Sequence, residues 1–223
     1  GHAAFLAIGC YANVLLQTEL GLPFIIAFPL AGLIAGVAGA IIARPMTKLH
    51  GIYLAIGTLA MAILIDDLIV LAEPLTNGVI GLFAPDISIF GIGFNRYGNP
   101  VGLYYVILAI TILIVLMYRN LQRSPLGRSF AAIRDSEISA QAMGVNVART
   151  KAIAFGISAG VTGLGGALMG HFAGIFNNET FNVIISIQLL LAIVIGGLGT
   201  IHGAFFGAAV VALLPQAIAM SRD

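Results

Sequence analysis

Charged residues are scarce in this chain of 223 residues. Asp, Glu, Lys and Arg make up 9% of it, whereas hydrophobic residues make up 60%. Because a soluble domain carries about 25% charged residues, this composition excludes an ordinary soluble protein and indicates an integral membrane protein. The apolar runs are long and continuous instead of alternating in strands of about ten residues, which favours membrane helices over a β-barrel.

The chain also has few of the residues that catalytic and metal sites use. Its single cysteine, Cys10, excludes internal disulfides, and its four histidines are scattered without the spacing of metal ligands. The run Gly196–Thr200 resembles a phosphate-binding loop only in its glycines, because it lacks the lysine that reaches a phosphate. We therefore predict no enzyme activity, no metal and no cofactor of its own; if ATP is used, another subunit would have to bind it.

What the chain does have is a series of long apolar segments. Several of them approach the ~20 residues that cross the hydrocarbon core of a bilayer. The sequence therefore predicts an all-α, polytopic membrane bundle, one transmembrane domain over residues 1–223, with further spans expected beyond both ends. Glycines four residues apart, as in Gly166/Gly170 and Gly203/Gly207, predict helices whose backbones approach closely. The apolar segments lie at about 3–18, 22–43, 51–73, 101–118, 152–176, 183–198 and 202–219.

The few positive charges orient this bundle. Eight of the ten Lys and Arg residues lie in two connections, the one around Arg44 and Lys48 and the one over residues 119–151. Since basic connections stay on the cytoplasmic side, we predict a cytoplasmic loop at 119–151. The connection at 74–100 is then periplasmic, and its apolar residues Ile87, Ile89, Phe90 and Ile92 predict a short hairpin or an interfacial turn.

The predicted cytoplasmic loop is patterned like two short helices. Ser124 followed by Pro125 is typical of a helix start, Asp135 is the predicted cap of a second short helix, and Gly144 is its predicted left-handed stop. Such a pair either docks on another protein or lies on the bilayer surface as an interfacial helix. Its predicted apolar face consists of Leu126, Phe130, Ile133 and Ile138.

Polar side chains within the apolar segments are candidates for function, because they are unfavourable in hydrocarbon. Asp66 and Asp67 lie near the outer end of the third segment, either as an interfacial pair that reaches water or as ion-coupling groups. Four further residues either border a translocation path or form hydrogen bonds that pack the helices. They are Asn13, Gln17, His171 and Gln188.

The basic loop resembles that of a known family. The runs Arg123-Ser-Pro-Leu-Gly-Arg128, Ala132-Ile-Arg-Asp-Ser-Glu137 and Ala140-Gln-Ala-Met-Gly144-Val-Asn146 resemble the cytoplasmic loop of branched-chain amino acid ABC importer permeases, in particular the LivM-type subunit. Three further stretches agree in order and spacing: Gly1–Tyr11, Gly51–Ala60 and Ser186–Gly203. The resemblance covers essentially the whole chain.

The resemblance implies a pore subunit in the inner membrane of a bacterium or archaeon. Its partners would be a second, LivH-type permease, two ABC ATPase subunits, a periplasmic or lipid-anchored substrate-binding protein and membrane lipid, with no nucleic acid. The substrates would be leucine, isoleucine and valine, carried by alternating access. The residues that couple the pore to the ATPases would be Arg128, Ile133, Arg134, Glu137, Ala140 and Gly144.

Two other functions remain open at this stage. A permease for urea or short amides resembles a branched-chain amino acid permease closely, and the sequence does not distinguish their substrates. A self-sufficient secondary carrier or channel would need its own ion-coupling residues, for which Asp66 and Asp67 are the candidates.

Overall fold

The computed structural model describes residues 1–46, 52–89 and 91–220, and long helices dominate it. Seven of the helices in this described part coincide with the seven predicted apolar segments, within a turn or two at each end. The predicted all-α bundle is therefore confirmed. These helices are α1 (His2–Thr18), α2 (Phe24–Met46), α3 (Ile52–Leu71), α5 (Pro100–Arg123), α8 (Val147–Ala173), α9 (Val183–Gly196) and α10 (Ile201–Met220).

Within the described residues, length and composition identify four stretches that are able to cross a membrane. They are α2, α5, α8 and the stretch Asn178–Gly196, in which the short 3-10 helix η1 (Asn178–Phe181) leads into α9. A span of hydrocarbon takes about 20 apolar residues, and all four approach or exceed that length. The chain is an integral membrane protein.

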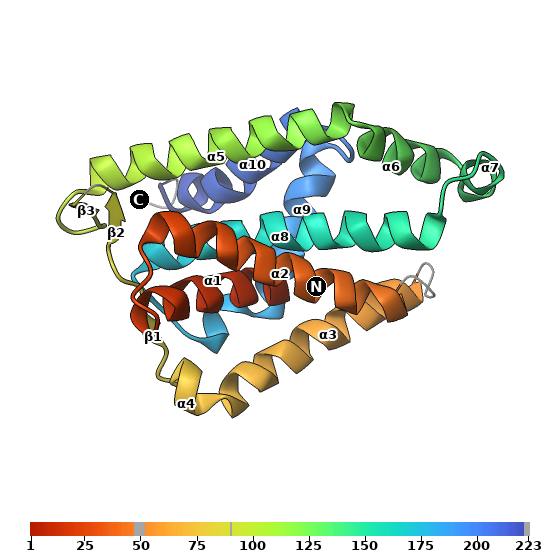
Figure 1. Cartoon of the computed structure of the whole chain (residues 1–223). Coiled ribbons are helices and arrows are strands. Elements are labelled where there is room, and N and C mark those ends of the chain that lie inside the picture. The colour runs from red at the N-terminus through yellow and green to blue at the C-terminus, as the bar shows by residue number, and fades with distance from the viewer. Residues whose placement is uncertain (47–51, 90, 221–223) are drawn as a thin grey trace.

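The two ends of the bundle carry different kinds of connection. Figure 1 shows two short helices, α6 (Pro125–Asp135) and α7 (Glu137–Ala142), at the end where α5 stops and α8 begins. The opposite end holds α4 (Glu73–Thr76) and the short strands, and α10 runs back toward it. Arg44 lies in the last turn of α2, whereas Lys48 and His50 lie outside the described residues.

Three helices, α1, α2 and α8, form the centre of the bundle. Their backbones approach so closely that a Cβ added at Gly9 would overlap the backbone of Gly163. A Cβ at Gly156 would lie 3.0 Å from the carbonyl oxygen of Gly36. A side chain at Gly9 would not fit, and one at Gly156 would have to displace its neighbour slightly, which confirms that the small residues serve close helix packing.

The last two helices form a tight hairpin. A Cβ at Gly196 would overlap the backbone of Gly203, and a Cβ at Gly207 would overlap that of Ala192. In the connection, Gly197 and Gly199 have positive φ values of 99° and 83°, which glycine adopts without steric penalty. The backbones of α9 and α10 are therefore in direct contact at these glycines.

Four short strands cover the end of the bundle opposite α6 and α7. Strand β1 (Leu82–Phe83) pairs with β4 (Ile175–Phe176), which joins the connection after α4 to the end of α8. Strands β2 (Ile87–Ile89) and β3 (Ile92–Phe94) pair as an antiparallel hairpin. This confirms the predicted hairpin for Ile87, Ile89 and Ile92, while Phe90 lies outside the described residues.

Candidate functional site

The predicted cytoplasmic segment begins with a capped helix. The Ser124 hydroxyl accepts a hydrogen bond of 3.3 Å from the Gly127 amide, and Pro125 is the first residue of α6. This cap confirms the predicted helix start. Because α5 extends to Arg123 and α8 begins at Val147, the first and last turns of the predicted loop 119–151 belong to these two long helices.

The second short helix begins one residue later than predicted. Asp135 is the last residue of α6, and Ser136 caps α7 by accepting a hydrogen bond of 3.2 Å from the Ser139 amide. The prediction that Asp135 caps this helix was therefore wrong, because a neighbouring serine in an extended conformation does so. Gly144 has a φ of 86° and donates its amide to Gln141, which confirms the predicted left-handed stop.

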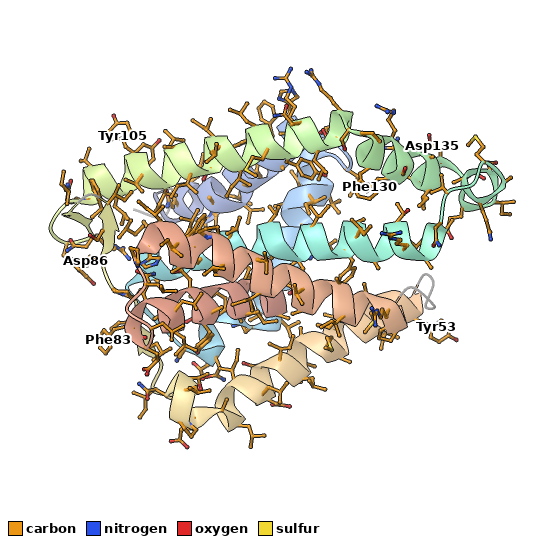
Figure 2. The ribbon with its side chains drawn as sticks, viewed as in Figure 1. Tyr53, Phe83, Asp86, Tyr105, Phe130 and Asp135 are labelled. Carbon is orange, nitrogen blue, oxygen red and sulfur yellow. The ribbon has the colours of Figure 1, made fainter. Side chains whose placement is uncertain are left out.

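The predicted apolar face of the two helices is divided in the structure. Ile133 and Phe130 are half-buried on α6, which contacts α8, and Figure 2 places Phe130 between the two helices. Ile138 on α7 is 84% exposed, and Met143 beside it is 72% exposed. One part of the face thus packs within the chain, and the other part stays free.

The charged residues of this segment form local contacts that hold it to α5 and α8. Arg128 donates a hydrogen bond of 3.2 Å to the carbonyl oxygen of Arg123, at the end of α5. Glu137 forms an ion pair of 2.6 Å with Lys151 of α8. Arg134 contacts Asp135 at 3.3 Å and reaches the connection between α9 and α10, where a Cβ on Gly199 would lie 3.7 Å from its Nη1.

Ala140 is the buried residue of α7. Its side chain is fully enclosed, and its carbonyl oxygen accepts a hydrogen bond of 3.0 Å from the Val145 amide. With Gly144, it closes the turn from α7 into α8. The six predicted coupling residues therefore lie in one continuous segment, from the start of α6 to that turn.

A second group of polar side chains lies near the opposite end of the bundle. Asn13 and His171 are buried, and with Gln17 they form a hydrogen-bonded cluster between α1 and α8. The Gln17 Nε2 atom lies 2.6 Å from Asn13 Oδ1 and 3.1 Å from His171 Nε2. The structure thus brings together three of the four residues predicted to border a path or to pack the helices.

The partners of His171 define its tautomer. Its Nδ1 atom lies 2.8 Å from the carbonyl oxygen of Pro85, which only accepts, so Nδ1 carries the proton. The Nε2 atom then accepts from Gln17, and the ring also packs edge-on against Phe24 at 5.1 Å. His171 therefore ties the connection between β1 and β2 to α1 and α8. Sequence reasoning did not identify Pro85, because a backbone carbonyl has no signature in the sequence.

Gln188 does not belong to this cluster. It is exposed on α9, three residues before the similarly exposed Leu191. Ser186 of α9, in contrast, is buried, and its hydroxyl accepts a hydrogen bond of 3.0 Å from the Ala3 amide. That bond satisfies one of the free amides at the start of α1.

Comparisons with known proteins agree with this architecture. The family model "Branched-chain amino acid transport system / permease component" matches residues 1–221. The chain is 33% identical, over 90% of its length, to the high-affinity branched-chain amino acid transport permease protein LivM of Escherichia coli and to that of Salmonella typhimurium. It is 27% identical, over 82% of its length, to a probable LivM protein of Methanocaldococcus jannaschii.

The chain spans 52% of the length of each of these three relatives. No solved structure matches it. The family match covers almost all of the chain and includes both the α6–α7 segment and the His171 cluster. The chain therefore belongs to the family of permease components of branched-chain amino acid transport systems.

Proposed function

We propose that the chain is part of a permease subunit of an ATP-driven importer for branched-chain amino acids. In this proposal it forms the membrane path together with a second permease subunit, and a substrate-binding protein delivers leucine, isoleucine or valine. Two separate ATPase subunits bind and hydrolyse ATP. The relatives named LivM support the substrate class, and the bundle of apolar helices supports the role as a permease.

The α6–α7 segment is the observation that carries the proposal. It projects from one end of the bundle and presents Ile138 and Met143 to the outside. Apolar side chains on a non-membrane segment are unfavourable in water, so a partner that covers them is stabilised by about 1.5–3 kcal/mol for each large side chain that becomes fully buried. A docked ATPase is the partner that the proposal assigns to them.

The same segment is suited to transmit movement. It is joined directly to α5 through Ser124 and to α8 through the turn at Gly144, and the Glu137–Lys151 ion pair adds a side-chain connection. A displacement of α7 by a partner therefore pulls on two long helices. Arg134 extends this contact to the connection between α9 and α10, so a third membrane element moves with it.

The cluster of Asn13, Gln17 and His171 has a different role in this proposal. Its atoms are engaged with one another and with Pro85, so it holds the outer connection closed against α1 and α8. We assign it to fastening this end of the permease and not to direct contact with the solute.

Uptake of radiolabelled leucine tests the proposal. The full-length gene is expressed with its sister permease, ATPases and binding protein in cells that lack their own importer. Leucine uptake that is lost when the ATPase is inactivated is the expected result. ATP-dependent uptake of urea without uptake of leucine would contradict the proposed substrate, and leucine uptake that persists without the ATPase would contradict the proposed energy source.

A further inference from the structure

Three buried side-chain oxygens have no hydrogen-bond partner within the described residues. They are Tyr11 Oη, Asp66 Oδ1 and Asn178 Oδ1, and they are all the atoms of this kind in that part of the chain. Each buried polar atom without a partner is unfavourable by about 1–3 kcal/mol, and native proteins contain few of them. These atoms come from α1, α3 and η1, which contact one another.

The three oxygens belong to one site. Asn178 forms a side-chain hydrogen bond with the Asp66 carboxylate, and the charge of Asp66 acts on the Tyr11 hydroxyl. The ring of Tyr11 is held edge-on against Phe176 at 5.0 Å and lies 6.5 Å from Phe181. Phe176 precedes η1 and Phe181 is its last residue, so these contacts hold the Tyr11 ring against the element that carries Asn178.

The chemistry of the site is that of an acceptor for a cation. The amide nitrogen of Asn178 already donates its hydrogen bond to Asp66. The atoms that remain without partners are a carboxylate oxygen, an amide oxygen and a hydroxyl oxygen. The nearby carboxylate of Glu179 adds further negative charge. A divalent metal does not fit, because the described residues contain no group of three or more His, Cys, Asp or Glu side chains that could hold one.

A primary ammonium group matches this arrangement in the number of its hydrogen-bond donors and in its charge. It carries three N–H donors and one positive charge, and the site offers three oxygens without partners, one of which belongs to the Asp66 carboxylate. Hydrogen bonds between an ammonium group and a carboxylate are about twice as strong as those between neutral groups. Urea also carries N–H donors, but it is neutral, so its hydrogen bonds to the Asp66 carboxylate lack the charge that strengthens those of an ammonium group.

We propose that Asp66, Asn178 and Tyr11 bind the ammonium group of the amino acid that the complete permease carries. This inference rests on the proposed function and adds a location for the substrate. The buried side chains of Ile65, Ile69 and Phe181 belong to the apolar cluster around Tyr11, which suits an aliphatic substrate. Asp66 and Asn178 are only half-buried as residues, so the site borders the outside of the bundle, where the substrate approaches.

Binding of radiolabelled leucine to the purified complex tests the site. The full-length permease with its partner permease and ATPases is placed in lipid nanodiscs without the substrate-binding protein. We expect Asp66→Asn to weaken leucine binding by about tenfold or more, because one charge-assisted hydrogen bond becomes a neutral one. Tyr11→Phe keeps the ring and removes the hydroxyl, and we expect a loss of about two- to tenfold.

The matched control is Glu73→Gln. It removes an exposed carboxylate from α4, at the same end of the bundle, and we expect leucine binding within about twofold of wild type. A second comparison uses 4-methylpentanoate, which has the carbon skeleton of leucine without the ammonium group. We expect that an excess of it does not displace leucine from the wild-type complex.

Three results would overturn the inference while leaving the proposed function intact. They are unchanged leucine binding in Asp66→Asn and Tyr11→Phe, displacement of leucine by 4-methylpentanoate, and an effect of Asp66→Asn that disappears when sodium and potassium are replaced by choline. The last result would assign the site to an inorganic cation. A wild-type complex that neither binds leucine nor supports its uptake would overturn the proposed function and this inference together.

Discussion

The two ends of the molecule differ in the range of their hydrogen bonds and in how much apolar surface they leave exposed. At the end with the strands, side chains far apart in the sequence close on one another: Gln17 and Asn13 meet His171, and His171 meets Pro85. At the end with α6 and α7, the hydrogen bonds run mostly between residues a few positions apart, and Ile138 and Met143 remain exposed.

This difference separates a polar cluster that finds its partners within the chain from an apolar surface that does not. At the first end, Asn13, Gln17 and His171 have partners in one another and in Pro85. The second end keeps apolar surface uncovered, which is typical of surfaces that bind another protein. The following predictions test whether stability depends on the first end and coupling on the second.

The largest expected effect is at the turn between α7 and α8. In Gly144→Pro, the proline cannot adopt the φ of 86° and removes the amide that bonds to Gln141. We expect leucine uptake to fall at least about tenfold, since α7 no longer connects rigidly to α8, while the protein still inserts in the membrane. Uptake and membrane fractionation measure this, with Gly144→Asn as the control because asparagine tolerates a left-handed conformation.

A related change addresses the half-buried part of the same segment. Ile133→Asp replaces a half-buried apolar side chain of α6 by a carboxylate, which is unfavourable where the side chain is shielded from water. We expect loss of uptake with normal insertion. Wild-type uptake in this variant or in Gly144→Pro would show that the segment does not couple transport.

The next effect is on stability at the opposite end. His171→Leu leaves Pro85 and the amides of Asn13 and Gln17 without their buried partner, and each such group costs about 1–3 kcal/mol. We expect a free energy of unfolding lower by about 2–4 kcal/mol, measured by thermal or denaturant unfolding in detergent. His202→Leu, at an exposed position of α10, is the matched control and should change stability little.

A smaller effect is expected from the exposed apolar residue of α7. Ile138→Asp changes a side chain that is 84% exposed, so the free energy of unfolding should stay within about 0.5 kcal/mol of wild type. Uptake should nevertheless fall about tenfold, which corresponds to about 1.4 kcal/mol of lost docking. Equal losses of stability and uptake would mean that the residue packs within the chain instead of against a partner.

The smallest effect concerns the ion pair between Glu137 and Lys151. The two side chains are 48% and 26% exposed, so solvent screens their attraction and the coupling energy should lie below about 1 kcal/mol. A double-mutant cycle with Glu137→Gln and Lys151→Met measures it. A coupling energy of several kcal/mol would show that this end, too, depends on internal contacts.

Much of the fold follows from local sequence patterns. The seven apolar segments, the hairpin around Ile87 and Ile92, the Ser124 cap and the turn at Gly144 depend on residues close together in the sequence, and each was predicted. The cap of α7 was misassigned to Asp135 because both Asp135 and Ser136 are good capping residues, and only the extended backbone of Ser136 decides between them.

The candidate sites were less predictable because they depend on contacts over long distances. Asn13 and His171 are 158 positions apart, and no periodicity relates them. The division of the predicted apolar face, with Phe130 facing α8 and Ile138 exposed, depends on the angle between α6 and α7. Tyr11 and Asn178 were not predicted as site residues, because a tyrosine and an asparagine become notable only when they are buried without partners.

The close backbone contacts within the bundle determine where a solute is able to pass. A methyl group added at Gly196 or Gly207, between α9 and α10, or at Gly166, between α8 and α1, would overlap backbone atoms of the neighbouring helix. A molecule as large as an amino acid therefore does not fit between these helices at the glycine crossings. Under the proposed function, we expect the permeation pathway to lie elsewhere, on a face that the partner permease covers.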